Sequence, residues 1–337
     1  MSLVGIIANP AAGKDIRRLV AHGRVVPIAE KVSVLRRVLL ALDAAGVERV
    51  VIMPDPSRIG RQAVEETDLK LSVDILEMLV SSEENDSTRA ATMMSEMDVD
   101  CLVTLGGDGT NRVVAKGSGR VPIVPISTGT NNVFPQMVEG TTAGLAAAVV
   151  ARGLVDLQEV CSTYKRLEVR VDGAVEDMAL IDLAVSREQF VGARAIWDIE
   201  TIEELFLTCA DPASIGLSSI GAQLHALSRA EPEALYLRLG ENGTTVLAPI
   251  APGMVRPVRI AEWRLLTPGE PVEITRKPSV IALDGERQFA ALPDQRVEVS
   301  LSADGPRVVA IDAALSEAAR LGVFTGASWA DGEQAAT

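Results

Sequence analysis

Cysteine and histidine, the residues that build disulfide frameworks and zinc sites, are scarce in this sequence. The 337 residues include three cysteines, Cys101, Cys161 and Cys209, which lie far apart and show no CxxC spacing. The two histidines, His22 and His225, do not form a ligand-like pair. This pattern argues against a disulfide framework and against a zinc site, and it predicts a protein of the reducing cytoplasm.

Positive charge is also in short supply. Asp and Glu number 46 against 32 Lys and Arg, so the net charge at pH 7 is −14 and the pI is about 4.7. A protein of this charge has no overall electrostatic attraction for nucleic acid or for an anionic membrane, and we expect no nucleic-acid partner. A phosphate-rich ligand would have to be bound locally, by backbone N–H groups, a few cations or a metal ion.

Long hydrophobic segments are missing as well. No apolar run reaches the roughly 18 residues of a membrane span, and the start MSLVGIIANPAAGKD lacks a basic stretch followed by a long apolar one. We therefore expect no signal peptide and no stable membrane insertion. What is present is an ordinary globular composition, with 47% hydrophobic and 23% charged residues, in a chain long enough for two domains. We also expect a homo-oligomer.

The first half of the sequence alternates predicted strands with predicted helices. Short apolar runs typical of buried parallel strands occur at residues 3–8, 47–53, 101–105 and 121–127. Helical periodicity follows the first and precedes the third of these runs, at residues 31–45 and 86–97. Alternation of this kind predicts an α/β domain with a parallel sheet and right-handed crossovers, which we assign to residues 1–153.

The pattern changes in the second half. Residues 166–185 alternate apolar and polar side chains around Asp172-Gly173, a hairpin signal, and residues 235–250 repeat the theme. We predict an all-β, sandwich-like domain over residues 154–305, with a helical insertion near 194–228. Residues 306–327 contain one more predicted strand and helix that can pack back on the first domain.

Three of the predicted strands in the first half end in loops of phosphate-binding character. These loops are NPAAGK (9–14), GGDGTN (106–111) and STGTNN (127–132). In an open parallel sheet, ligands bind beyond the carboxyl ends of the strands, so the three loops face one crevice. Glycines allow the backbone to approach a ligand closely, and successive N–H groups and helix N-termini bind anions without side-chain charge.

None of these loops is one of the common nucleotide-binding motifs. GDGTNR departs from the GxGxxG dinucleotide fingerprint because Arg112 occupies its third glycine position. NPAAGKD departs from the P-loop because Asp15 stands where Ser or Thr would bind Mg²⁺. Each loop alone is weak evidence, and it is their occurrence at the ends of separate strands that indicates a shared site.

Asp108 lies between glycines in the second loop. A carboxylate close to bound phosphates repels them unless it holds a metal ion or accepts a proton from an attacking hydroxyl. The structural alternative is an aspartate that caps the helix beginning near Thr110. We favour the functional role for Asp108.

These loops also carry a resemblance to a known superfamily. GGDGT, preceded by NPxxG and followed by Gly-Thr-Asn-Asn, resembles the NAD kinases and the diacylglycerol-type lipid kinases. The longer strings NPAAGKDIRRLV, GGDGTNRVVAKG and VPISTGTNNVFP resemble the acetoin catabolism protein X branch of the ATP-NAD kinase-like family. In the second half, ALDGE (282–286) is similar to the Asp-Gly-Glu segment of lipid kinases.

The resemblance implies an N-terminal α/β domain, a C-terminal β-sandwich and a cleft between them that holds ATP and Mg²⁺. It implies that Asp108 is catalytic, and that Asp284 and Glu286 bind the metal or the acceptor. The structural alternative for Asp284 and Glu286 is an ordinary hairpin turn with solvated charges, since Asp-Gly is a strong hairpin signal. The implied nucleotide-binding residues are Asn9, Gly106, Gly107, Gly109, Thr110, Gly129, Thr130, Asn131 and Asn132. We add Gly13 and Lys14 of the first loop, where Lys14 can supply positive charge.

The leading functional hypothesis is a kinase that transfers the terminal phosphoryl group of ATP to a hydroxyl, with NAD as the implied acceptor. A lipid or sphingoid kinase is the alternative, supported by Asp284-Gly285-Glu286. The acidic balance and the 3% aromatic content count against it, as does the lack of a basic amphipathic helix for membrane docking. A third hypothesis is a nucleotide-binding regulator without turnover. The sequence alone does not identify the acceptor.

Overall fold

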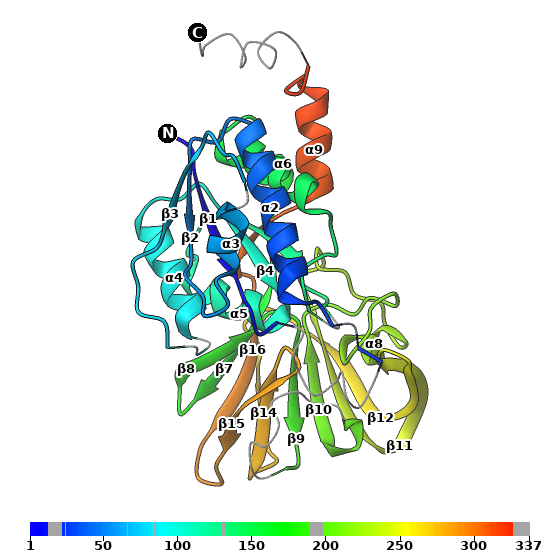
Figure 1. The fold of residues 1–337 in the computed structure, drawn as a ribbon. Coiled ribbons are helices and arrows are strands. Elements are labelled where there is room, and N and C mark those ends of the chain that lie inside the picture. The colour runs from blue at the N-terminus through cyan, green and yellow to red at the C-terminus, as the bar shows by residue number, and fades with distance from the viewer. Residues whose placement is uncertain are drawn as a thin grey trace, which may run out of the picture.

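The computed structural model describes residues 1–12, 22–23, 25–65, 67–81, 83, 85–129, 132–188 and 198–325. Figure 1 shows an α/β region, which carries the N-terminus, and a β-rich region joined to it. Both parts of the predicted fold class are confirmed: a mostly parallel α/β sheet first and antiparallel, sandwich-like sheets second.

The α/β region is built on a seven-stranded sheet, counted over the described residues, in the order β3-β2-β1-β4-β5-β17-β6. All neighbours are parallel except β17 and β6. The strands are β1 (Leu3–Ala8), β2 (Arg49–Ile52), β3 (Ser72–Ile75), β4 (Cys101–Gly106), β5 (Ile123–Ser127), β6 (Cys161–Thr163) and β17 (Arg307–Val309). The edge strand β3 is not predicted from the sequence because its residues are half-buried to exposed and lack an apolar run.

Helices cover both faces of this sheet. They are α2 (Ile28–Ala44), α3 (Ile59–Glu65), α4 (Asn85–Glu96), α5 (Asp108–Gly117), α6 (Gly140–Ala151), α7 (Leu157–Val160) and α9 (Ile311–Arg320). Successive residues of β1 point to opposite faces, so Ile6 packs in the cluster with α2 and α6, and Ile7 packs in the cluster with α4. Gly144 lets α6 approach α2 closely, since a Cβ there would lie 2.7 Å from the Val38 carbonyl oxygen.

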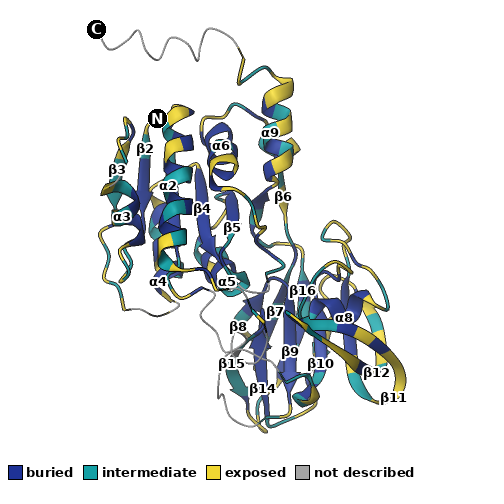
Figure 2. Cartoon of the chain, turned by 45° about the vertical axis from the view of Figure 1, so that its right-hand side comes forward, coloured by how far each residue is buried: buried dark blue, intermediate teal, exposed yellow. Residues whose placement is uncertain are grey.

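The chain returns to the first sheet after the β-rich region. Val308 of β17 pairs with Ile123 of β5, and α9 follows directly. Ile311, Ala314 and Ala318 of α9 are buried in the same hydrophobic cluster as α2 and α6. Figure 2 shows the buried strands β4 and β5 behind helices whose outer faces are exposed.

The β-rich region consists of two antiparallel sheets in the described chain. Their orders are β12-β11-β10-β9-β14-β15 and β13-β16-β7-β8. The strands are β7 (Arg166–Val171), β8 (Ala174–Ala179), β9 (Asp182–Ser186), β10 (Ile202–Leu207), β11 (Ala234–Ala251), β12 (Met254–Leu266), β13 (Pro271–Glu273), β14 (Ser279–Leu283), β15 (Glu286–Ala291) and β16 (Val297–Ser302). Leu167 and Val299 from the smaller sheet pack against Val185, Phe206 and Ile281 from the larger one, as in a sandwich.

The predicted helical insertion near 194–228 is wrong for most of its described length. Residues 202–207 form β10, an inner strand of the larger sheet, and helix is limited to a single turn at Ile199–Thr201 and to α8 (Ser218–Ala222). Strand β10 is buried on both faces because it lies between two hydrophobic clusters. A segment buried on both faces has no alternating pattern, so periodicity does not distinguish it from a helix.

No helix in the described ranges is long and apolar enough to cross a membrane.

Candidate functional site

The GGDGT loop connects β4 to α5 at the carboxyl edge of the parallel sheet. Strand β4 is buried along its whole length, and Gly107 is the N-cap of α5, with Asp108 as the first helical residue. The first intrahelical hydrogen bond runs from the Asn111 N–H to the Gly107 carbonyl, at 3.1 Å. The N–H groups of residues 108–110 therefore precede the helical ladder and point toward the loop mouth.

The glycines of this loop are needed because neighbouring side chains lie too close for a Cβ atom, not because the backbone is left-handed. Gly106, Gly107 and Gly109 are not among the residues with positive φ. A Cβ on Gly106 would lie 2.4 Å from the Thr110 Cβ, and one on Gly107 would lie 2.9 Å from the Asn132 Oδ1. The second loop is thus packed against its own helix and against the third loop.

The first loop is attached to the second by side-chain hydrogen bonds. Asn9 Nδ2 donates to Thr110 Oγ1 at 2.9 Å. Beneath the loop, the fully buried Lys31 Nζ donates to the carbonyls of Asn9, Pro10 and Ala12 at 2.8–3.1 Å. Sequence reasoning missed Lys31; the available signal was a charged residue at the start of the apolar face of α2. Gly13 and Lys14 lie outside the described residues.

The third loop closes on the second. The Thr128 N–H donates to the Gly106 carbonyl at 2.9 Å, and Asn132 Nδ2 donates to Ser127 Oγ at 2.7 Å. A Cβ on Gly129 would lie 2.5 Å from the Asn132 amide. Asn132 therefore fills the space between two of the predicted glycines. The other two predicted residues of this loop, Thr130 and Asn131, are outside the described part of the chain.

The Asp108 carboxylate contacts backbone beyond this third loop. Its Oδ1 accepts from the N–H groups of Val133 and Phe134, at 3.0 and 2.7 Å, and its Oδ2 lies 3.1 Å from the Val133 nitrogen. These contacts connect α5 to the segment that follows β5 and orient the carboxylate.

Asp284 and Glu286 differ in where they lie. The Asp284-Gly285 turn joins β14 to β15, with φ of 51° and 76°, as expected of a two-residue hairpin. The Glu286 carboxylate is next to the start of α5, since its Cδ would be 3.4 Å from a Cβ on Gly109. The structure thus brings Glu286 to the GGDGT loop, whereas the Asp284 carboxylate lies between the Leu180 and Ile181 amides of the β-rich region and Arg112 of α5.

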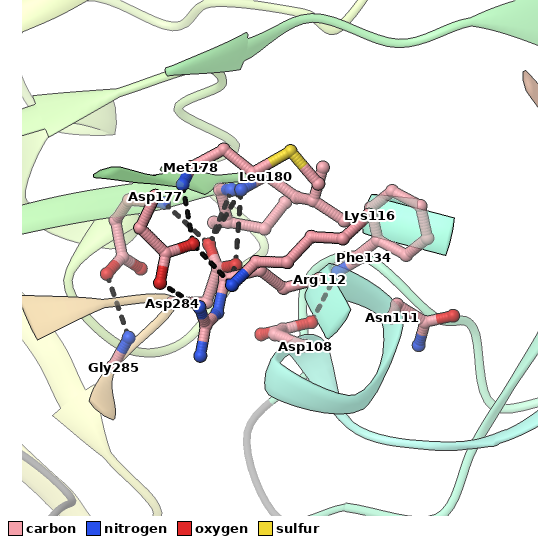
Figure 3. Close-up of polar contacts among 12 residues, drawn as sticks. Asp108, Asn111, Arg112, Lys116, Phe134, Asp177, Met178, Leu180, Asp284 and Gly285 are labelled. Atoms are coloured by element: carbon pink, nitrogen blue, oxygen red, sulfur yellow. Dashed lines mark hydrogen bonds and ion pairs between the residues drawn. The ribbon is translucent and has the colours of Figure 1, made fainter. Parts of the chain in front are cut away.

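The Asp284 side chain is fully buried at the junction of the two regions (Figure 3). It accepts hydrogen bonds from the N–H groups of Leu180 and Ile181, at 2.7–3.1 Å, and lies 3.8 Å from Arg112 Nε. Burial raises the pKa of Asp284 to about 8; the Asp182 carboxylate adds to this effect and Arg112 opposes it.

Arg112 is a buried cation that sequence reasoning noted only as a departure from a glycine motif. Its side chain is 0% exposed, and Nη1 lies 3.0 Å from the Asp177 carboxylate of β8. One helical turn further on, Lys116 Nζ contacts the same carboxylate at 2.6 Å. Figure 3 shows Arg112 between Asp177 and Asp284. Helix α5, which carries Asp108, is thereby held against the β-rich region by charge.

In the described residues, no group of three or more His, Cys, Asp or Glu side chains is placed to hold a metal ion. A metal at this site would therefore take part of its coordination from the ligand. Mg²⁺ commonly binds in this way, through one or two carboxylates together with phosphate oxygens and water.

Two family models together match most of the chain. Residues 4–154 match the ATP-NAD kinase N-terminal domain, and residues 165–304 match the acetoin catabolism protein X C-terminal domain. Acetoin catabolism protein X of Cupriavidus necator is 38% identical over 333 residues, which cover 94% of this chain and 92% of that protein. The chain belongs to the acetoin catabolism protein X family, and the resemblance found in its sequence is confirmed.

Similarity to NAD kinases is weaker. The NAD kinase of Methanopyrus kandleri is 26% identical over 225 residues, covering 65% of this chain and 69% of that protein. The crystal structure of an NAD kinase from Archaeoglobus fulgidus in complex with ATP aligns with a TM-score of 0.45 and 14% identity. The alignment covers 83% of this chain and 100% of that one.

Proposed function

We propose that this chain is an ATP-dependent kinase that transfers the terminal phosphoryl group to a hydroxyl acceptor, the 2′-hydroxyl of NAD. The observation that carries the proposal is the joining of three strand-end loops around the start of α5. Asn9 binds Thr110, and Asn132 fills the space between the second and third loops. The N-terminal family match and the NAD kinase of Methanopyrus kandleri support NAD as the acceptor.

The site is suited to hold phosphates by main-chain groups. The N–H groups at the start of α5 lie at the positive end of the helix dipole, which favours an anion. The buried Lys31 ammonium lies beneath the first loop and adds positive charge there. Such a site needs few surface cations, which is consistent with a chain of net charge −14.

The donor set fits Mg²⁺. Asp108 is the first residue of α5, and Glu286 lies against its neighbour Gly109, so two carboxylates lie at the start of this helix. When bound, Mg²⁺ would neutralise the charge that develops on the transferred group. In the proposed reaction Asp108 accepts the proton of the attacking hydroxyl, and the amides of Val133 and Phe134 keep its carboxylate oriented.

The test is a comparison of acceptors with the purified chain. ATP and Mg²⁺ are supplied with NAD, with diacylglycerol or with sphingosine, and ATP hydrolysis without acceptor gives the background. NADP formation above background, lost in Asp108→Asn, supports the proposal. Phosphorylated lipid without NADP identifies the lipid kinase alternative instead.

A non-catalytic nucleotide-binding regulator is the second candidate. The observation that favours it is the engagement of Asp108 with two backbone amides, which is also what a purely structural carboxylate would show. In that case calorimetry detects ATP binding, no acceptor is phosphorylated, and Asp108→Asn changes stability without changing turnover.

A further inference from the structure

Arg229, from the β-rich region, reaches the same segment that Asp108 contacts. It follows α8 in the chain, and its Nη2 donates to the Val133 carbonyl. Its Nη1 lies 3.4 Å from the Phe134 carbonyl. The two amides that orient Asp108 and the two carbonyls that bind Arg229 therefore belong to the same pair of residues.

One peptide group links the two charges. The Val133 carbonyl and the Phe134 N–H are the two ends of a single peptide unit. Arg229 binds its oxygen, and its N–H donates to Asp108 Oδ1 at 2.7 Å. A cation on the oxygen polarises the peptide and strengthens donation from its N–H, because hydrogen bonds in a chain reinforce one another in a low dielectric.

Aromatic rings hold the guanidinium in place. The Arg229 Cζ lies 5.0 Å from the centre of the Tyr164 ring and 5.8 Å from that of Phe134. The two rings meet edge to face at 5.5 Å. This arrangement adds cation–π attraction to the hydrogen bonds and restricts the rotamers of Arg229.

A buried lysine anchors the turn that carries Arg229. Lys165 is 7% exposed, and its Nζ contacts the carbonyls of Ser228, Glu231 and Glu233 at 2.6–3.3 Å. An ammonium group has three N–H donors, so three carbonyls match its capacity. Lys165, the residue before β7, thus holds the turn by its backbone carbonyls, and Arg229 extends from a turn that is fixed in place.

We propose that Arg229 is a positioning residue through which the β-rich region sets the orientation of Asp108. It binds the Val133–Phe134 peptide from the carbonyl side, while Asp108 binds it from the amide side. The catalytic consequence rests on the proposed function; the coupling between Arg229 and Asp108 does not. The two can therefore be tested separately.

The coupling is tested by hydrogen–deuterium exchange of the Phe134 amide, measured by NMR or by mass spectrometry of a peptide that contains Phe134. The next residue in such a peptide, Pro135, has no backbone amide and adds nothing to the exchange signal. Arg229→Met is expected to speed exchange of the Phe134 amide about tenfold, because it removes one charge-assisted hydrogen bond to the same peptide group. Arg229→Lys is expected to restore part of the protection. Arg264→Met is the matched control, because Arg264 also lies over a ring, that of Tyr236 at 5.6 Å, within the β-rich region.

A double variant shows whether the two residues act through one peptide. Asp108→Ala alone also speeds exchange of the Phe134 amide, and adding Arg229→Met is expected to change it by less than about twofold further, since both remove the same interaction. If Arg229→Met leaves exchange as slow as in Arg264→Met, the proposal is overturned. Full additivity of the two substitutions overturns it as well.

The catalytic part is read from phosphoryl transfer. Arg229→Met is expected to lower kcat at least about tenfold with an unchanged dissociation constant for ATP, and Arg229→Lys to recover part of the loss. Faster exchange with unchanged kcat overturns the positioning role. If the wild-type chain phosphorylates no acceptor, the proposed function fails, and the exchange experiment still decides the coupling.

Discussion

In the α/β region the candidate site is made of main chain and small residues, whereas the β-rich region contributes buried charges. Loops with the glycines Gly106, Gly107 and Gly129 pack against one another at the strand ends of the first region. Arg229 and Asp177 reach the same place from the second region and contact the residues around Asp108. In the proposed function, the first region would shape the phosphate cradle and the second would set the orientation of the Asp108 carboxylate.

The largest effect expected is on turnover. Asp108→Asn removes the charge that the α/β region places at the start of α5, so it can neither take a proton nor bind Mg²⁺. We expect phosphoryl transfer to fall by about 10²- to 10⁴-fold, with an unchanged circular dichroism spectrum, because the amide oxygen can still accept from Val133 and Phe134. Near wild-type kcat with the true acceptor would rule out the catalytic assignment of Asp108.

Removing a charge from the β-rich side is expected to destabilise the junction. Asp177→Ala leaves the buried Arg112 without its closest carboxylate, and we expect a loss of about 3 kcal/mol in the free energy of unfolding, measured with urea. The control is Glu262→Ala, which breaks the exposed pair with Arg238 and should cost less than about 1 kcal/mol. Equal losses in the two variants would show that the charges between the regions contribute little.

The pH dependence of stability isolates Asp284. An acid whose pKa is raised from 3.8 to about 8 on folding binds more protons in the folded state. Its contribution is therefore fully present at low pH and is lost as pH rises toward 8. Relative to Asp284→Asn, the wild-type free energy of unfolding should fall by up to about 1.4 kcal/mol per pH unit.

The pH experiment needs a control for the other acids. Asp304→Asn removes an exposed acid of the same half of the chain, and its urea midpoints should run parallel to those of the wild type across the series. A wild-type curve that also runs parallel to Asp284→Asn would contradict the burial argument.

The smallest effect expected concerns the cradle itself. Gly107 has φ of −106°, which alanine adopts readily, so the cost of Gly107→Ala comes from a Cβ 2.9 Å from Asn132 Oδ1. We expect the free energy of nucleotide binding, measured by calorimetry, to weaken by somewhat more than about 1 kcal/mol. Gly240→Ala, whose Cβ would meet Ala261 at 3.3 Å in the β-rich region, is the control. Unchanged affinity in a stable Gly107 variant would mean that the loop is an ordinary turn.

Much of the fold could be predicted because its elements repeat simple patterns. Strands β1, β2, β4 and β5 are short apolar runs, and α2 has buried residues at helical spacing, such as Leu35, Leu39 and Leu42. The predictions for two of the strands failed for physical reasons. The edge strand β3 has little to bury, and β10 is buried on both faces, so neither shows the period of its own structure.

The loops of the candidate site were visible in the sequence, but their electrostatic surroundings were not. Gly106 to Thr110 form one contiguous string, whereas Lys31 and Arg229 are single charged residues that belong to no recognisable motif. Each becomes informative only when the carbonyls that bind it are known, and those carbonyls belong to segments distant in the chain.

Local spacing along the chain was enough to predict strands β1, β2, β4 and β5, the glycine loops that follow β1, β4 and β5, and membership of a recognisable family. Tertiary structure alone decided which charges surround Asp108. Arg229 lies 121 positions from Asp108 in the chain, yet both bind the Val133–Phe134 peptide. Burial makes such contacts strong, since charges interact more strongly in a low dielectric. Burial depends on how the whole chain packs and cannot be deduced from a short segment of the sequence.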